Sequence, residues 1–252
     1  RWGFRSSIDL SNPDICFHLH LANNEAVLSV DGSSSSLHKR GYRPAVGMAP
    51  IKETLAAGLM RMTEWDGTIN LVDPLCGSGT FLIEAVSTLL GITSGKDRQF
   101  LFENWPDFDK SLWQRELNIA QNVKKFNKKL PKIIGCEVDE TIAKAAMENV
   151  RKSGLEKYIE IKNCSFQELK LPAGLGILVC NPPYGKRIGD ENLLPNLYKE
   201  LGDYCKGKAS GWDLWLLNGN PKLSKYLGMK ANKRFQVNNG SIDCRWIHYK
   251  IK

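Results

Sequence analysis

Short, almost uninterrupted apolar runs alternate with helical patterns through most of this chain, and this alternation limits the fold more than any other feature. The runs lie at residues 69–72, 133–136 and 177–180. Such runs are typical of parallel strands that are covered on both faces. Between them, apolar residues recur at helical spacing in residues 81–89 and 142–150. The order predicts an α/β, doubly wound sheet with right-handed crossovers, which binds ligands at the carboxyl ends of its strands.

The start of the chain follows a different pattern. Apolar and polar residues alternate on both sides of Asn23-Asn24, which predicts a small β-hairpin. We therefore expect an N-terminal β-hairpin and connector in residues 1–48 and a catalytic domain in residues 49–252. The chain begins at Arg1 without a methionine, so we also expect that sequence precedes it.

A long insertion interrupts the alternation. The separation of Gly79 from Glu137 far exceeds the roughly 20 residues of a simple strand-helix-strand unit, and we assign the surplus to about residues 92–131. Its recurring aromatic residues can stack on the bases of a nucleic acid, although packing against the parent domain is the commoner role. They are Phe100, Phe102, Trp105, Phe108 and Trp113.

The amino-acid composition limits the kinds of partner and cellular environment that we expect for this chain. The 252 residues suffice for one large core with a small appendage. The formal charge of +8 suits a polyanion such as RNA, because each neutralised phosphate releases counterions, although many enzymes with small substrates are equally basic. The seven cysteines lack disulfide or zinc-ligand spacing, which predicts reduced thiols, no metal and a cytoplasmic protein. No apolar stretch approaches the roughly 20 residues of a membrane span.

A glycine-rich turn, Asp73-Pro74-Leu75-Cys76-Gly77-Ser78-Gly79-Thr80, follows the first apolar run. Its two glycines leave a strand and open a helix, so a ligand can approach the bare backbone. Leu82 replaces the third glycine of dinucleotide-binding turns. The carboxylate of Asp73 can hold an ammonium group, and S-adenosylmethionine carries one; a tight turn without a ligand is the alternative. The predicted cofactor-binding residues of this turn are Asp73, Pro74, Cys76, Gly77, Gly79 and Thr80.

Acidic residues follow the second apolar run. Glu137 lies where a carboxylate can accept both ribose hydroxyls of a nucleoside, and we predict that it is the ribose ligand. Asp139 is a second candidate cofactor residue, and it can also cap the next helix, which Gly154 can end. Capping alone is the structural alternative for Asp139.

The run Asn181-Pro182-Pro183-Tyr184 follows the third apolar run directly. An amino group on a heteroaromatic ring is a poor nucleophile, because its lone pair is delocalised into the ring. The side-chain oxygen of Asn181 and the carbonyl of Pro182 can accept its hydrogens and aim the lone pair at a methyl carbon, while Pro183 helps to stiffen the loop. Tyr184 offers a face on which an extruded base can stack. We predict that these four residues are catalytic, although a double proline can also serve only as a turn.

Together these motifs resemble the amino-methyltransferase superfamily, and four further runs narrow the resemblance. They are L-H-K-R-G-Y-R at 37–43, A-P-I-K-E-T-L-A at 49–56, N-P-P-Y-G-K-R at 181–187 and N-G-S-I-D-C at 239–244. From about residue 28 onward the chain resembles the THUMP-containing large-subunit ribosomal RNA guanine-N2 methyltransferases. Four basic residues of these runs are candidate RNA contacts: Arg40, Arg43, Lys186 and Arg187.

The resemblance implies a Rossmann-like, S-adenosylmethionine-dependent methyltransferase with a seven-stranded, mostly parallel sheet whose last hairpin, at 235–247, is antiparallel. It implies the N2 amine of a guanine in 23S ribosomal RNA as the target. In the family a THUMP RNA-binding domain precedes the catalytic domain; we expect that domain to be missing from this chain, whose first hairpin would be the connecting piece. It also places Asn163 and Cys164 beside the adenine of the cofactor, with Asn163 standing where the family usually has Asp.

Other functions are compatible with part of the pattern. Asn-Pro-Pro-Tyr also resembles DNA adenine-N6 methyltransferases and protein glutamine methyltransferases, but those lack the R-G-Y-R and P-I-K-E-T runs found here. A catalytically silent RNA-binding module that keeps the fold is a further alternative. The intact Asp73, Gly77, Gly79 and Asn181 favour an enzyme.

Overall fold

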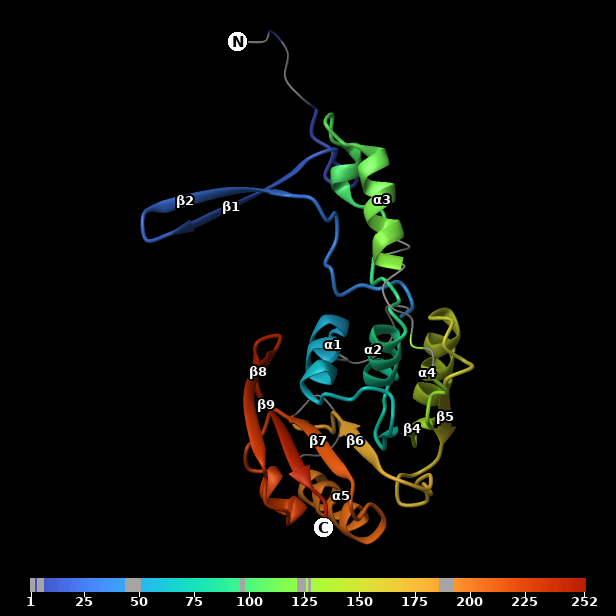
Figure 1. Ribbon diagram of the computed structural model, residues 1–252. Coiled ribbons are helices and arrows are strands. Elements are labelled where there is room, and N and C mark those ends of the chain that lie inside the picture. Colours follow the sequence, from blue (N-terminus) through green and yellow to red (C-terminus); the bar gives the residue numbers. More distant parts are fainter. Residues whose placement is uncertain are drawn as a thin grey trace. The chain divides into compact units, whose positions relative to one another are not determined.

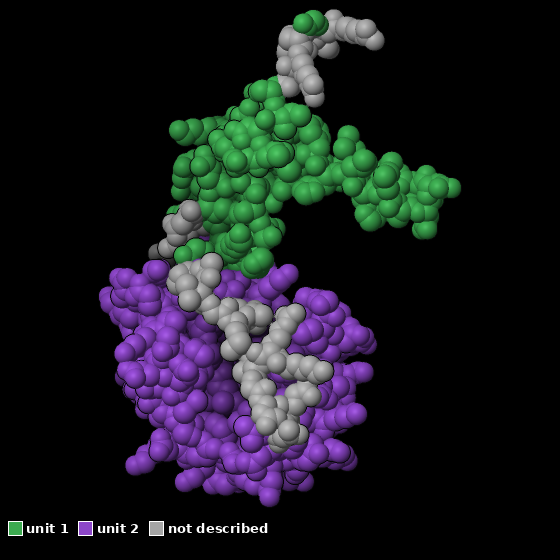
Figure 2. All heavy atoms as spheres, turned by 180° about the vertical axis from the view of Figure 1, so that it is seen from behind, with its two compact units in different colours: residues 1–41, 94–123 green, residues 42–93, 124–252 purple. Residues whose placement is uncertain are grey.

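The computed structural model describes residues 7–43, 51–95, 98–121, 128–185 and 193–252, together with Gly3 and Phe126. The chain forms two compact units, which Figure 2 distinguishes by colour: residues 1–41 with 94–123, and residues 42–93 with 124–252. We call them unit 1 and unit 2. Within the described ranges, no helix combines the length and the apolar character needed to cross a membrane.

Unit 2 is built on a seven-stranded sheet (Figure 1). The strand order is β5-β4-β3-β6-β7-β9-β8; β9 is antiparallel to β7 and β8, and the other pairs are parallel. The predicted Rossmann-like fold with an antiparallel last hairpin is thus confirmed. The strands are β3 (Asn70–Asp73), β4 (Ile133–Glu137), β5 (Ile159–Asn163), β6 (Gly176–Cys180), β7 (Asp213–Asn218), β8 (Lys233–Asn239) and β9 (Ile242–Lys250).

Helices cover both faces of this sheet. On one face lie α1 (Glu53–Met62), α2 (Thr80–Leu89) and α4 (Glu140–Lys152), and on the other lies α5 (Leu194–Lys208) (Figure 1). Because successive strand residues point to opposite faces, Leu71 joins the core on the α2 side, whereas Val72 joins the core on the α5 side. Burial on both faces explains why these strands are continuously apolar.

Unit 1 contains the predicted hairpin, β1 (Cys16–Ala22) and β2 (Glu25–Asp31). Its two-residue turn has positive φ at Asn23 (49°) and Asn24 (61°), a conformation that asparagine tolerates better than most residues. The unit also contains the short helix η1 (Leu101–Asn104) and α3 (Lys110–Gln121).

The aromatic residues of the insertion pack on one another within unit 1. The ring centroid of Phe102 lies 5.1 Å from those of Phe100 and Trp113 and 5.9 Å from that of Phe108. Such distances are those of packed aromatic pairs. The rings therefore form a small core, which favours the packing role over stacking on nucleic-acid bases.

Candidate active site

The glycine turn joins β3 to α2 in unit 2. Gly77 (φ 51°) and Gly79 (φ 78°) both have left-handed backbone conformations, which explains the choice of glycine. A Cβ at Gly77 would meet no atom within 4 Å, so there is open space beside the backbone. The turn is fixed to β4, because the backbone N–H of Cys76 donates to the Cys136 carbonyl at 2.9 Å. A ligand can thus approach a rigid, bare backbone.

The carboxyl group of Asp73 is almost completely buried, with 1% of the residue exposed. It accepts a hydrogen bond from the backbone N–H of Leu75 at 3.1 Å. Burial raises the pKa of Asp73 well above its usual value, and the negative charge of Glu137 raises it further. Ionising a buried carboxyl group costs free energy, and a cation that binds beside the group offsets this cost. This environment fits the ammonium group for which Asp73 was predicted.

Both carboxylate oxygens of Glu137 accept backbone hydrogen bonds. Oε2 accepts from Gly77 N at 3.1 Å, and Oε1 accepts from Asp139 N at 3.0 Å. Each oxygen keeps a further lone pair, which suits the two hydroxyls of a ribose. The side chain of Asp139 accepts from Ile142 N at 3.0 Å and caps α4, so its predicted capping role is confirmed. A ligand contact of Asp139 stays a prediction.

Asn163, the last residue of β5, and Cys164, which follows it, contact the end of β4 and the loop after it. The side-chain amide of Asn163 donates to the carbonyls of Glu137 (2.9 Å) and Val138 (3.1 Å). These bonds use its nitrogen, so its oxygen can still accept from an adenine amine. Cys164 is half-buried, and its Sγ lies 3.2 Å from that of Cys136. Asn163 and Cys164 thus both lie beside the loop after β4, which is compatible with the predicted contact to adenine.

The side chains of Pro74 and Cys76 pack inward from the glycine turn. Both residues are buried. A Cβ at Gly135 would lie 2.9 Å from the Cys76 sulfur, so the absence of a side chain at Gly135 makes room for that thiol. Burial also raises the pKa of Cys76 well above its usual value. We therefore expect these two residues to shape the turn, and any cofactor contact to come from their backbone.

Asn181 begins the loop after β6, and β6 pairs directly with β3. The two parallel strands end at the same edge of the sheet, so Asn181 and the glycine turn lie at neighbouring strand ends. The Asn181 Oδ1 atom is buried and has no hydrogen-bond partner among the described residues. An unsatisfied buried acceptor costs about 1–3 kcal/mol, and it calls for an explanation. A ligand that donates a hydrogen to Oδ1 would remove this cost.

The last hairpin of the sheet anchors Tyr184. Its hydroxyl accepts a hydrogen bond from the side-chain amide of Asn239 at 2.8 Å, and the Cys244 sulfur lies 3.8 Å away. Burial raises the pKa of Tyr184 to about 12, so the phenol is neutral at physiological pH. The ring packs against Gly219, where a Cβ would lie 2.6 Å from two ring carbons. Three residues around Tyr184 thus belong to the site although the sequence analysis did not predict a role for them: Gly219, Asn239 and Cys244.

Replacing Gly219 with alanine should push the Tyr184 ring out of place, because the new methyl group would overlap it. We expect the rate of methyl transfer to fall about tenfold, because a misplacement of roughly 1 Å in an active site can cost up to about 100-fold. Cofactor affinity should stay within about twofold. Methyl transfer at saturating cofactor and calorimetric titration with S-adenosylhomocysteine measure the two quantities. An equal loss in both quantities would contradict the expectation that the substitution acts through Tyr184 and leaves the cofactor site intact.

Arg43, a predicted RNA contact, is engaged within unit 2. Its guanidinium lies 3.1 Å from a carboxylate oxygen of Glu53, which is 3% exposed. It also donates to the Ile51 carbonyl (3.2 Å) and to the hydroxyl of Thr80 in the glycine turn (3.4 Å). This geometry favours a positioning role for Arg43 over an RNA contact. Arg40 is half-buried and stays a prediction, and Lys186 and Arg187 lie outside the described residues.

A match to a known family identifies the kind of enzyme. The family described as "RMKL-like, methyltransferase domain" matches residues 40–248. The chain belongs to this methyltransferase family. S-adenosylmethionine is therefore its methyl donor, as predicted. Three features of the site fit this donor: the buried carboxyl group of Asp73, the open space at Gly77 and the lone pairs of Glu137.

Three proteins illustrate where this RMKL-like methyltransferase domain stands among its relatives. A Synechocystis protein named as a candidate RNA methyltransferase is 42% identical over 252 residues, which are 100% of this chain and 65% of the relative. Ribosomal RNA large subunit methyltransferase K/L of Desulfotalea psychrophila is 36% identical over 248 residues, 96% of this chain and 34% of the relative. The structure of SMU.472, a candidate methyltransferase complexed with S-adenosylhomocysteine, superimposes with a TM-score of 0.88 at 33% identity, over 96% of this chain and 63% of that one. The chain thus spans about a third to two thirds of these relatives.

Proposed function

We propose that this RMKL-like domain methylates an exocyclic amino nitrogen of an RNA base, and that its target is the N2 amine of a guanine in 23S ribosomal RNA. The observation that carries the proposal is the buried Oδ1 of Asn181, which lies at the strand end beside the glycine turn and accepts no hydrogen bond from any residue that the structure describes. An amine hydrogen is the kind of donor that this oxygen lacks.

The roles of the loop residues follow from the chemistry of an aromatic amine. Asn181 Oδ1 and the Pro182 carbonyl hold the two amine hydrogens and draw the nitrogen toward tetrahedral geometry. The same oxygens stabilise the positive charge that develops on nitrogen, so the proton can leave to water afterwards without a strong general base. Tyr184, fixed by Asn239, supports the extruded base by stacking. Bound S-adenosylmethionine supplies the electrophilic methyl group.

RNA is the substrate that the remaining observations favour. The formal charge of +8 suits a polyanion. Two relatives bear names that refer to RNA, and one of these names specifies the large ribosomal subunit. The R-G-Y-R and P-I-K-E-T runs support a guanine-N2 specificity over adenine-N6 methylation of DNA.

The proposal is tested by offering labelled S-adenosylmethionine to undermodified ribosomal RNA, transfer RNA and DNA, and by identifying the modified nucleoside by mass spectrometry. We expect N2-methylguanosine in large-subunit ribosomal RNA. N6-methyladenine in DNA would replace the proposal with its alternative. Failure to bind S-adenosylhomocysteine in a calorimetric titration would instead indicate a catalytically silent module.

A further inference from the structure

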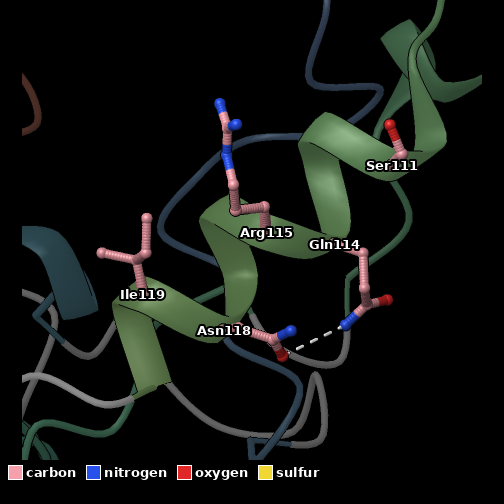
Figure 3. A pocket seen from close by; sticks show the side chains of 5 residues that line it. All are labelled: Ser111, Gln114, Arg115, Asn118 and Ile119. Carbon is pink, nitrogen blue, oxygen red and sulfur yellow. Dashed lines mark hydrogen bonds between the residues drawn. The ribbon is translucent and has the colours of Figure 1, made fainter.

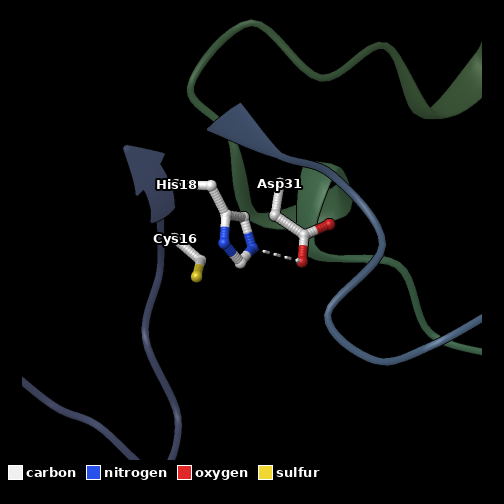
Figure 4. Close-up of side chains that lie close together, drawn as sticks. All are labelled: Cys16, His18 and Asp31. Carbon is white, nitrogen blue, oxygen red and sulfur yellow. Dashed lines mark ion pairs between the residues drawn. The ribbon is translucent and has the colours of Figure 1, made fainter. Parts of the chain in front are cut away.

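Three side chains with metal-binding atoms converge at the open end of the β1-β2 hairpin (Figure 4). Cys16 and Asp31 are direct partners in the strand register, and His18, two residues after Cys16, points to the same face. One ligand atom from each residue lies within 4.8 Å of the other two, and His18 Nε2 lies 3.6 Å from Asp31 Oδ2. The register of the hairpin therefore brings Asp31 next to Cys16 and His18, so that three side chains with metal-binding atoms lie together.

We propose that Cys16, His18 and Asp31 bind a zinc ion, with a water molecule as the fourth ligand. Thiolate, imidazole and carboxylate are the three donor types that zinc accepts in tetrahedral sites. Bonds of about 2.0–2.3 Å at tetrahedral angles place ligand atoms roughly 3.3–3.7 Å apart. The 3.6 Å separation of the His18 and Asp31 atoms already matches this spacing. The Cys16 sulfur needs only a side-chain adjustment from within 4.8 Å.

Ser33 holds the carboxylate of Asp31 in an orientation that suits a metal ligand. Its backbone N–H and its hydroxyl donate to Oδ1 of Asp31 at 2.7 and 2.6 Å. These bonds orient the carboxylate and leave Oδ2, the oxygen nearest His18, available for a metal. Carboxylates that bind metals are typically oriented by hydrogen bonds of this kind.

A metal at this position would close the hairpin at the end opposite its Asn23-Asn24 turn. Cys16 is the first residue of β1 and Asp31 the last of β2, so the ion would cross-link both strands. An isolated two-stranded hairpin is marginally stable, and Phe17 and Leu19 on its other face are 58% and 62% exposed. Binding would release one proton, from the Cys16 thiol, and it would need no oxidant.

Cobalt(II) is the spectroscopic probe for this site. We expect one equivalent of Co²⁺, added to the metal-free 252-residue chain, to produce a thiolate-to-cobalt charge-transfer band and the visible bands of tetrahedral cobalt. Zn²⁺ should displace the cobalt. Cys16→Ser should remove the charge-transfer band. His18→Ala should weaken Zn²⁺ binding at least tenfold, because even the loss of a residue that only hydrogen-bonds to a metal ligand typically costs about 10- to 100-fold in affinity.

His20→Ala is the matched control, because His20 lies on the same hairpin face but outside the cluster. It should keep both the bands and the affinity. The zinc site is overturned if no charge-transfer band forms, if the band survives Cys16→Ser, or if His20→Ala abolishes it. Circular dichroism checks that each variant keeps the native fold, and none of these readouts depends on the proposed methyl transfer.

Discussion

Methyl transfer should fall by about a hundred- to a thousandfold when Asn181 is replaced by alanine, the loss that removal of one preorganised polar group in an active site typically causes. The physical reason is that Asn181 Oδ1 is a buried acceptor with no hydrogen-bond partner in the described part of the chain. Its removal leaves one amine hydrogen of the target base unbound. Affinity for S-adenosylhomocysteine should change less than about twofold. Single-turnover transfer from labelled cofactor and calorimetric titration give the two values.

Asn196→Ala is the control for this experiment. Asn196 is an exposed residue of α5 whose amide donates to Glu200, so its loss should affect neither transfer nor cofactor binding. If Asn181→Ala transferred methyl groups at the wild-type rate, or if it lost cofactor binding to the same extent as activity, Asn181 would not be the acceptor for the substrate amine.

Replacing Asp73 with asparagine should have two opposite effects. Burial raises the pKa of Asp73, so its ionised form destabilises the folded, ligand-free protein at neutral pH. Asparagine removes that cost and can keep the hydrogen bond from Leu75 N. The melting temperature should therefore rise, by about 2–4 °C for each kcal/mol gained. Affinity for S-adenosylhomocysteine should fall roughly ten- to a hundredfold, since a hydrogen bond to a charged group contributes about 1.5–3 kcal/mol.

The pH dependence provides a second test of Asp73. The pKa of Asp73 is higher in the folded state than its value of 3.8 in the unfolded state. The free energy of unfolding is therefore not reduced by Asp73 below pH 3.8, where the group is protonated in both states, and it falls as the pH rises through the folded-state pKa. The stability difference between Asp73→Asn and the wild type should thus be largest at neutral pH and vanish near pH 4 or below. Asp203→Asn, an exposed change on α5, is the control and should leave affinity unchanged. A variant that lost stability and kept its affinity would exclude the proposed cofactor contact.

Local patterns predicted the central strands and their motifs well. Ile133–Glu137 and Gly176–Cys180 differ by one residue each from the runs 133–136 and 177–180. They are recognisable because parallel strands buried on both faces are almost wholly apolar. The cap at Asp139 is equally local, because it depends on an N–H three residues away.

Contacts that depend on the sheet order could not be predicted from local patterns. Tyr184 meets Gly219 and Asn239 only because β7, β9 and β8 follow β6 in space. The sequence also shows that Arg43 is charged, but not that Glu53 is its partner, and an arginine in a basic run is compatible with an RNA contact until its neighbours are known. The spacing of Cys16 and Asp31 is likewise uninformative without the register of the hairpin.

The anchoring of Tyr184 by the last hairpin has a consequence for the order of events during synthesis. A ribosome delivers the chain from the N-terminus at about 5–20 residues per second. The glycine turn and the Asn181 loop emerge before Asn239 and Cys244, which fix the tyrosine ring. The residues of both loops are therefore synthesised first, and Tyr184 can be held in place only after translation has passed residue 244.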